Sequence, residues 1–198
     1  MVNKSIEQQY QKLSHREHVL QRSDTYIGSI VTEPKEMYLP DQLDSLSALT
    51  LSKQTVDFNP GLVKLYDEIL TNASDHAIRT GEVKKIKIEV TNDHITIEND
   101  GPGIPIELHK EEKMYVPELL FGELISGENF DDTEERVVGG RNGLGAKLTN
   151  VWSTKFLVEC ADGKKKFVQT FTNNMAKKTK AKVTNLKKSY TKISFRPD

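Results

Sequence analysis

The feature that most limits how this chain can fold is a long amphipathic helix followed directly by a β-hairpin, over residues 59–99. Asn59 and Pro60 are typical of a helix N-terminus, where asparagine caps free N–H groups and proline fits the first turn. Gly81 predicts the end of the helix. Apolar residues at helical spacing predict its buried face: Leu62, Leu65, Tyr66, Ile69, Ala73 and Ala77. Such a helix must cover a second layer, and the adjacent strands can supply it.

The hairpin places a polar side chain in line with apolar ones. Residues 86–90 alternate apolar and polar side chains, and Ile95, Ile97 and Asn99 share one phase of the second strand. Because side chains alternate across a strand, we expect Asn99 to point to the helix-covered face. A carboxamide buried there without a partner costs about 1–3 kcal/mol, so Asn99 is predicted to bind something. The glycines of residues 101–103 then predict a turn.

The remaining elements complete an α+β pattern. Ser14 and Glu17 fit a capping box at the start of a short helix that ends near Arg22, and Ser23-Asp24 predicts a turn. Further expected elements are an irregular stretch with two short strands over 31–57, helices over 117–126 and 146–152, a polar glycine-rich loop over 127–145, and strands over 154–160, 165–172 and 190–195. We expect a two-layer α/β sandwich in which a mixed, mostly antiparallel sheet carries helices on one face. Residues 1–30 would form an N-terminal arm and residues 31–198 one domain.

Composition excludes several classes of protein. Of 198 residues, 36 % are hydrophobic and 29 % charged, as in soluble globular domains. No apolar run approaches the roughly 20 residues of a membrane span, and the first residues contain no secretory signal, so no membrane partner is expected. The single cysteine, Cys160, excludes an internal disulfide, and an intracellular location is expected.

The net charge of −1 conceals an uneven distribution. Residues 160–198 contain ten lysines, one arginine and two aspartates, a balance of +9 that leaves −10 for the rest. One interpretation is a contact with DNA or another polyanion. The other is a solvated sheet edge whose lysines discourage pairing with other sheets. The sequence favours the second interpretation and leaves the first open.

Glu68 and Asn72 lie one turn apart on the predicted helix, so both side chains reach the same small volume. A glutamate can orient and deprotonate the water that attacks a γ-phosphate, and Asn72 offers a neutral oxygen to Mg²⁺. By itself the pair fits an ordinary exposed helix face better. Its combination with Asp75 and with the strand-end segment 99–103 favours a nucleotide site.

A glycine-rich segment ends in a lysine. Gly139, Gly140, Gly143 and Gly145 precede Lys147. Glycines let backbone N–H groups approach phosphate oxygens closely, and a helix N-terminus adds a favourable dipole. The spacing is not that of a Walker A loop, and glycine density by itself also fits a flexible surface loop. The five histidines show no zinc spacing.

Together these segments resemble the GHKL ATPase family, whose nucleotide-binding domain has the Bergerat fold. Within that family the chain is similar to the ATPase domains of type IIA DNA topoisomerases of the eukaryotic or viral kind. The similarity spans nearly the whole chain and is most specific in the glycine-rich lid. It rests on residues 22–29, 67–73, 99–105, 140–147 and 189–198.

The resemblance implies a role for each matching residue. Glu68 is expected to be the general base, Asn72 the Mg²⁺ ligand and Asn99 the contact to the adenine amino group. Tyr26 is expected to reach the nucleotide of the partner subunit. The other expected nucleotide contacts are Gly127, Glu128, Asn129, Gly140, Arg141, Asn142, Gly143, Leu144, Gly145, Ala146, Lys147 and, beside the adenine, Thr191. The expected ligands are therefore ATP and Mg²⁺.

Some positions depart from the family pattern, and the wider function follows only from the resemblance. Gly127-Glu128 stands in place of two serines, and Leu144 in place of a tyrosine. The family is expected to close a homodimeric ATP gate and, in the full-length enzyme, to pass one DNA duplex through another. Its transducer and cleavage core have no counterpart in this sequence, so tight ATP binding with slow hydrolysis is expected.

The source and two other functions stay open. The expected location is nuclear for a eukaryotic source, and the host cell or virion for a viral one. One alternative is another ATPase of the same family, of the mismatch-repair or Hsp90 chaperone type. The other is a non-catalytic, nucleotide-gated interaction domain.

Overall fold

The computed structural model describes residues 5–10, 12–41, 50–124, 126 and 143–198. Its helices are α1 (Ile6–Gln9), α2 (His15–Gln21), α3 (Ser23–Tyr26), α4 (Pro60–Thr80), α5 (Val116–Gly122) and α6 (Gly145–Val151). Its strands are β1 (Glu33–Pro40), β2 (Leu51–Phe58), β3 (Ile86–Val90), β4 (Ile95–Asn99), β5 (Ser153–Asp162), β6 (Lys165–Thr172), β7 (Lys177–Lys178), β8 (Lys182–Asn185) and β9 (Ser189–Pro197).

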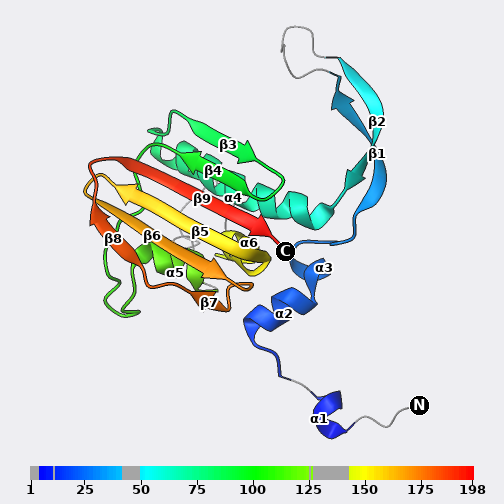
Figure 1. Cartoon of the computed structure of the whole chain (residues 1–198), viewed down its shortest axis with the longest axis horizontal. Coiled ribbons are helices and arrows are strands. Elements are labelled where there is room, and N and C mark those ends of the chain that lie inside the picture. The colour runs from blue at the N-terminus through cyan, green and yellow to red at the C-terminus, as the bar shows by residue number, and fades with distance from the viewer. Residues whose placement is uncertain (1–4, 11, 42–49, 125, 127–142) are drawn as a thin grey trace.

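Two layers make up the main body of the molecule. A seven-stranded sheet has the order β3-β4-β9-β5-β6-β7, with β8 also paired to β6, while β1 and β2 form a separate sheet. Every described strand pair is antiparallel. Helices α4, α5 and α6 lie on one face of the main sheet (Figure 1). The expected α+β sandwich with helices on one face is confirmed.

The register of the strands aligns apolar residues in rows across the helix-covered face. Phe156 lies opposite both Phe195 and Phe171, with ring centroids 6.4 and 6.5 Å apart. Ile193 lies opposite Val158 in the next row of the same face. All five side chains are buried. Because side chains alternate along each strand, this register decides which polar residues also face the helices.

Helix α4 begins and ends where the sequence predicts. The Asn59 side chain accepts a hydrogen bond from the Leu62 N–H at 2.9 Å, and Gly81 adopts φ 67° at the C-terminus. The predicted buried face is wrong at Leu62, which is 41 % exposed. The buried residues Gly61, Leu65, Ile69 and Ala73 form a narrower stripe at intervals of four, because α4 meets the main sheet mainly at β4 and otherwise lies along α6. Among the described residues, no helix combines the length and apolar character that a membrane span requires.

The N-terminal arm is partly packed on the domain. Ser14 and Glu17 form the predicted capping box, with the Ser14 N–H donating to Glu17 Oε2 at 2.8 Å. Val19 and Ile27 belong to the buried core. The turn predicted at Ser23-Asp24 is instead the start of the short helix α3, which the Ile27 N–H closes by donating to the Ser23 carbonyl at 2.8 Å.

Residues 31–57 are more regular than expected. Strands β1 and β2 pair along their whole length, from Glu33 opposite Phe58 to Pro40 opposite Leu51. The hairpin projects away from the main sheet (Figure 1). Apolar and polar side chains alternate little over β1, so its strand signal is weak. Pairing between the two backbones, and not burial, makes this segment regular.

Three boundaries at the far side of the sheet also differ from expectation. β7 and β8 were not predicted because segments of two and four residues are too short to show apolar alternation; they pair with opposite ends of β6. Helix α5 ends at Gly122, short of the predicted Ser126. The Ser126 hydroxyl lies 2.6 Å from the Leu119 carbonyl and 2.7 Å from the Glu123 carbonyl, so its single hydrogen is shared between them. This contact covers the C-terminal end of α5, where the Leu119 carbonyl also accepts from the Glu123 N–H at 3.3 Å.

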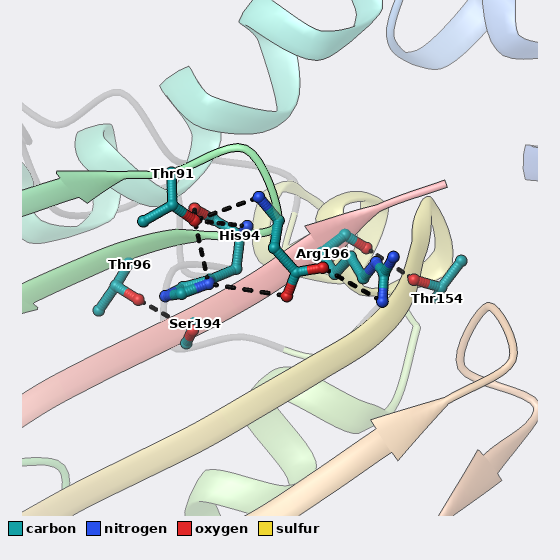
Figure 2. A network of polar contacts seen from close by, with 7 residues as sticks. Thr91, His94, Thr96, Thr154, Ser194 and Arg196 are labelled. Atoms are coloured by element: carbon teal, nitrogen blue, oxygen red, sulfur yellow. Dashed lines mark hydrogen bonds and ion pairs between the residues drawn. The ribbon is translucent and has the colours of Figure 1, made fainter.

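A polar network fixes the hairpin β3–β4 against β9 (Figure 2). The Thr91 hydroxyl accepts from the His94 N–H at 3.0 Å within the turn, and Asp93 forms an ion pair with Arg196 at 3.2 Å. One row further along the strands, the Thr96 hydroxyl donates to Ser194 at 2.9 Å. These contacts hold β4 in register with β9, and that register positions the strand-end residues of the candidate site.

Candidate nucleotide site

Asn99 ends β4 and points into the molecule, as predicted. The residue is 4 % exposed, and its Nδ2 donates to the Asp100 carbonyl at 2.8 Å. Thr191 of β9 lies directly opposite Asn99, and Cys160 of β5 lies opposite Thr191. Asn99 and Thr191 are candidates from two distant segments of the sequence, and the antiparallel register places them opposite each other. A hydroxyl therefore lies beside a buried carboxamide at this end of the sheet, an arrangement that can bind the polar edge of a base.

The turn after β4 is held tightly on both sides. A Cβ at Gly103 would overlap the Ala161 carbonyl, since it would lie only 2.5 Å from the Ala161 carbonyl carbon. Gly101 has φ 92°, a conformation that favours glycine. Asp100 accepts hydrogen bonds from the Lys85 and Lys84 N–H groups at 2.9 and 2.8 Å, which lower the pKa of its carboxyl.

His76 is a residue of the site that the sequence reasoning missed. It lies one turn after Asn72 on α4, and its Nε2 contacts the Pro102 carbonyl at 2.7 Å. A carbonyl only accepts, so Nε2 carries the proton; Nδ1 then accepts from Arg79 at 3.3 Å. The available signal was its position on the same helical stripe as Glu68 and Asn72. His76 ties the helix to the turn that follows Asn99.

Glu68 lies between a lysine and the start of α6. Its Oε1 forms an ion pair with Lys64 at 2.5 Å, which raises the pKa of Lys64. On the other side, a Cβ added to Gly145 would overlap Glu68 Oε2 and come 3.0 Å from its Cδ. The first residue of α6 therefore lies directly against the carboxylate. Asn72 follows one turn later on α4 with an exposed side chain.

Lys147 is buried in α6 although it carries an ammonium group. The residue is 3 % exposed. Its Nζ donates to the Gly143 carbonyl at 2.6 Å and to the Ser126 carbonyl. Burial lowers the pKa of Lys147 to about 8, because two neutral carbonyls compensate poorly for lost hydration. Among the described residues, no carboxylate forms an ion pair with the Lys147 ammonium group.

The structure locates some of the other predicted residues. Gly143 and Leu144 precede α6, and Ala146 is buried within it. Tyr26 and His18 are hydrogen-bonded at 2.9 Å between Oη and Nδ1, within the arm of the same chain. The predicted contacts at Gly127, Glu128, Asn129, Gly140, Arg141 and Asn142 lie outside the described residues.

An antiparallel sheet, a helix that carries a carboxylate and a glycine-rich segment that ends against that carboxylate define a class of ATPase domain. Residues 59–196 match the family described as "Histidine kinase-, DNA gyrase B-, and HSP90-like ATPase", and the chain belongs to this family. Membership of the family implies that the domain binds a nucleotide.

The individual proteins that the chain resembles form a narrower group than this family. The chain is 50 % identical over 196 residues to DNA topoisomerase 2 of Meyerozyma guilliermondii, covering 96 % of this chain and 14 % of that protein. The ATPase region of Saccharomyces cerevisiae topoisomerase II matches with a TM-score of 0.89 and 44 % identity, over 96 % of this chain and 51 % of that one. The ATPase and transducer domains of DNA topoisomerase II from Balamuthia mandrillaris match with a TM-score of 0.90 and 42 % identity, over 98 % and 51 %. The chain thus spans about half of these structures and a much smaller part of the curated relative.

Proposed function

We propose that this chain is the ATP-binding and ATP-hydrolysing gate domain of a type II DNA topoisomerase. The observation that carries the proposal is that one helix, α4, contacts both halves of the site. Glu68 meets Gly145 at the glycine-rich segment, and His76 meets Pro102 at the turn after Asn99. These two contacts lie about 12 Å apart along the helix axis, a span that an extended nucleoside triphosphate can bridge.

Each end of the site has its own chemistry. At the strand end, Asn99 would bind the adenine amino group, with Thr191 beside it. At the other end, Lys147 and backbone N–H groups before α6 would stabilise the charge that develops during phosphoryl transfer. Glu68 would orient the attacking water and take its proton. The lid residues Gly127 to Asn129 and Gly140 to Asn142 would complete the contacts to ribose and phosphates.

The residues present fit a magnesium ion shared with the nucleotide. Asn72 offers an exposed carboxamide oxygen one turn from Glu68. The described residues include no group of three His, Cys, Asp or Glu side chains able to hold a metal. Mg²⁺ usually combines one or two protein oxygens with water and phosphate oxygens, so Asn72 would be the protein ligand. The bound ion would neutralise phosphate charge.

The wider function rests on the similarity to topoisomerase II. We propose residues 1–30 as an arm that places Tyr26 against the nucleotide of a partner subunit when two copies close, and residues 31–198 as the ATPase domain. In the whole enzyme this closure would accompany passage of one DNA duplex through another. An intracellular location follows from action on DNA.

Calorimetric titration with a non-hydrolysable ATP analogue, with and without Mg²⁺, tests the proposal first. We expect binding that Mg²⁺ strengthens. Glu68→Ala should retain the affinity for the analogue and abolish hydrolysis in the full-length enzyme, whereas Asp67→Ala, an exposed neighbour off the stripe, should change neither. No binding of the analogue would refute a nucleotide site, and wild-type turnover in Glu68→Ala would remove Glu68 as the base.

A further inference from the structure

Two loops bring four lysines together at one end of the main sheet. The β5–β6 turn and the β8–β9 connection lie side by side there (Figure 1). The Gly163 N–H donates to the Lys188 carbonyl at 2.9 Å, and the Leu186 N–H donates to the Lys164 carbonyl at 2.9 Å. We call the four exposed residues of these loops the lysine ledge: Lys164, Lys165, Lys187 and Lys188.

The ledge is preformed and its charge is largely uncompensated. The Asp162 carboxylate holds the turn by accepting from the Lys164, Lys165 and Ile106 N–H groups at 2.9, 2.7 and 3.1 Å. Within the part of the chain that the structure describes, none of the four ammonium groups forms an ion pair. The four ledge lysines and Asp162 together carry a formal charge of +3.

Protection of a sheet edge does not explain these four lysines. Lys177, Lys178 and Lys182 lie on the short strands β7 and β8, where they fit that role. The ledge residues instead lie in loops or, for Lys165, on the first residue of a strand that β8 already pairs. Lys178 is moreover paired with Glu118 and Glu123 at 3.0 and 3.3 Å. The two groups of lysines therefore differ in place, and Lys178 also differs from the ledge residues in having carboxylate partners.

We propose that the lysine ledge binds the phosphate backbone of duplex DNA directly, without any nucleotide bound to the domain. Lysines act as point charges that suit phosphates and read no sequence. Binding of single strands usually uses exposed aromatic side chains on which bases stack. The neighbouring Tyr190 is unsuited to this, because it is half-buried and its hydroxyl donates to Glu159 at 2.6 Å. The charge pattern thus favours a duplex, and this contact is separate from the proposed ATP chemistry.

Fluorescence anisotropy with a labelled duplex of about 20 base pairs and the full chain tests the ledge. If each lysine neutralises one phosphate, raising salt from about 50 to 200 mM should weaken binding by about 100-fold. Replacing all four ledge lysines by glutamine should remove most of the affinity and flatten this salt dependence. The matched control replaces Lys12, Lys35, Lys53 and Lys155, which are exposed elsewhere, and should retain the affinity of the wild type.

Folding of both variants is checked by thermal unfolding and by affinity for the ATP analogue. Equal loss of DNA binding in the ledge and control variants would overturn the proposal, as would no measurable binding by the wild type. Equally tight, ledge-dependent binding of polyglutamate would assign the ledge to an acidic protein and also overturn it. Loss of ATP binding with DNA binding intact would count against the proposed function and leave the ledge unaffected.

Discussion

Replacement of Gly145 by alanine gives a direct test of how closely α6 approaches Glu68. The added Cβ would overlap Glu68 Oε2 and lie 3.0 Å from its Cδ, while Glu68 Cβ would be 3.7 Å away. The carboxylate must move or α6 must shift, and such overpacking typically costs about 1–3 kcal/mol. In a chain of this size, each kcal/mol lowers the melting temperature by about 2–4 °C.

In the Glu68→Ala background, we expect Gly145→Ala no longer to destabilise the protein. Without the carboxylate, the nearest remaining atom is the Cβ at 3.7 Å, an ordinary contact. Gly145→Ala should then be neutral or stabilising by up to about 1 kcal/mol, because alanine favours the helix. Loss of the partly exposed pair between Glu68 and Lys64 affects both Glu68→Ala variants equally and therefore cancels in the coupling. We therefore expect a double-mutant coupling of about 1–3 kcal/mol.

Chemical denaturation of the wild type, both single variants and the double variant measures this coupling. Titration with the ATP analogue should also show weaker binding for Gly145→Ala, because the displaced carboxylate or helix disturbs the phosphate end of the site. The reasoning would be refuted if Gly145→Ala changed the free energy of unfolding by the same amount with and without the Glu68 carboxylate.

Three further predictions concern the two ends of the site. Asn99→Ala should weaken ATP binding about tenfold to a hundredfold and leave binding of inorganic triphosphate unchanged; equal losses in two calorimetric titrations would argue against a base contact. His76→Ala removes the hydrogen bond to Pro102 and should weaken ATP binding by about fivefold, with no change for triphosphate. Because burial lowers the pKa of Lys147 from 10.5 to about 8, the unfolded chain holds the extra proton between these values, and the contribution of Lys147 to the free energy of unfolding should rise with pH across that window. The rise should be clearest between pH 8 and 9, because burial raises the pKa of Cys160 from 9.0 to about 12 and opposes it at higher pH. Denaturation at several pH values should show no such rise for Lys147→Met.

Local signals in the sequence predicted the elements that carry the site. The caps of α4 at Asn59 and Gly81 and the capping box at Ser14 act within one helical turn, so neighbouring residues suffice to predict them. Alternation in β4 likewise predicted that Asn99 points inward. These inferences succeeded because a backbone of regular geometry fixes the direction of each side chain.

These local signals could not predict how segments far apart in the sequence pack together. The exposure of Leu62 depends on where α4 leaves the sheet, and the pairing of β7 and β8 depends on the neighbouring β6. Neither is visible in the periodicity of the segment itself. The same holds for β1 and β2, whose regularity comes from their mutual pairing.

By itself, the sequence determined which residues have the chemistry for a nucleotide and on which helix or strand each one lies. Only the tertiary structure decided that Gly145 lies against Glu68, that Thr191 lies opposite Asn99, and that His76 binds the Pro102 carbonyl. Such contacts depend on strand register and on the fit of one helix against another. These are properties of the whole packed core, and residues far apart in the chain set them jointly.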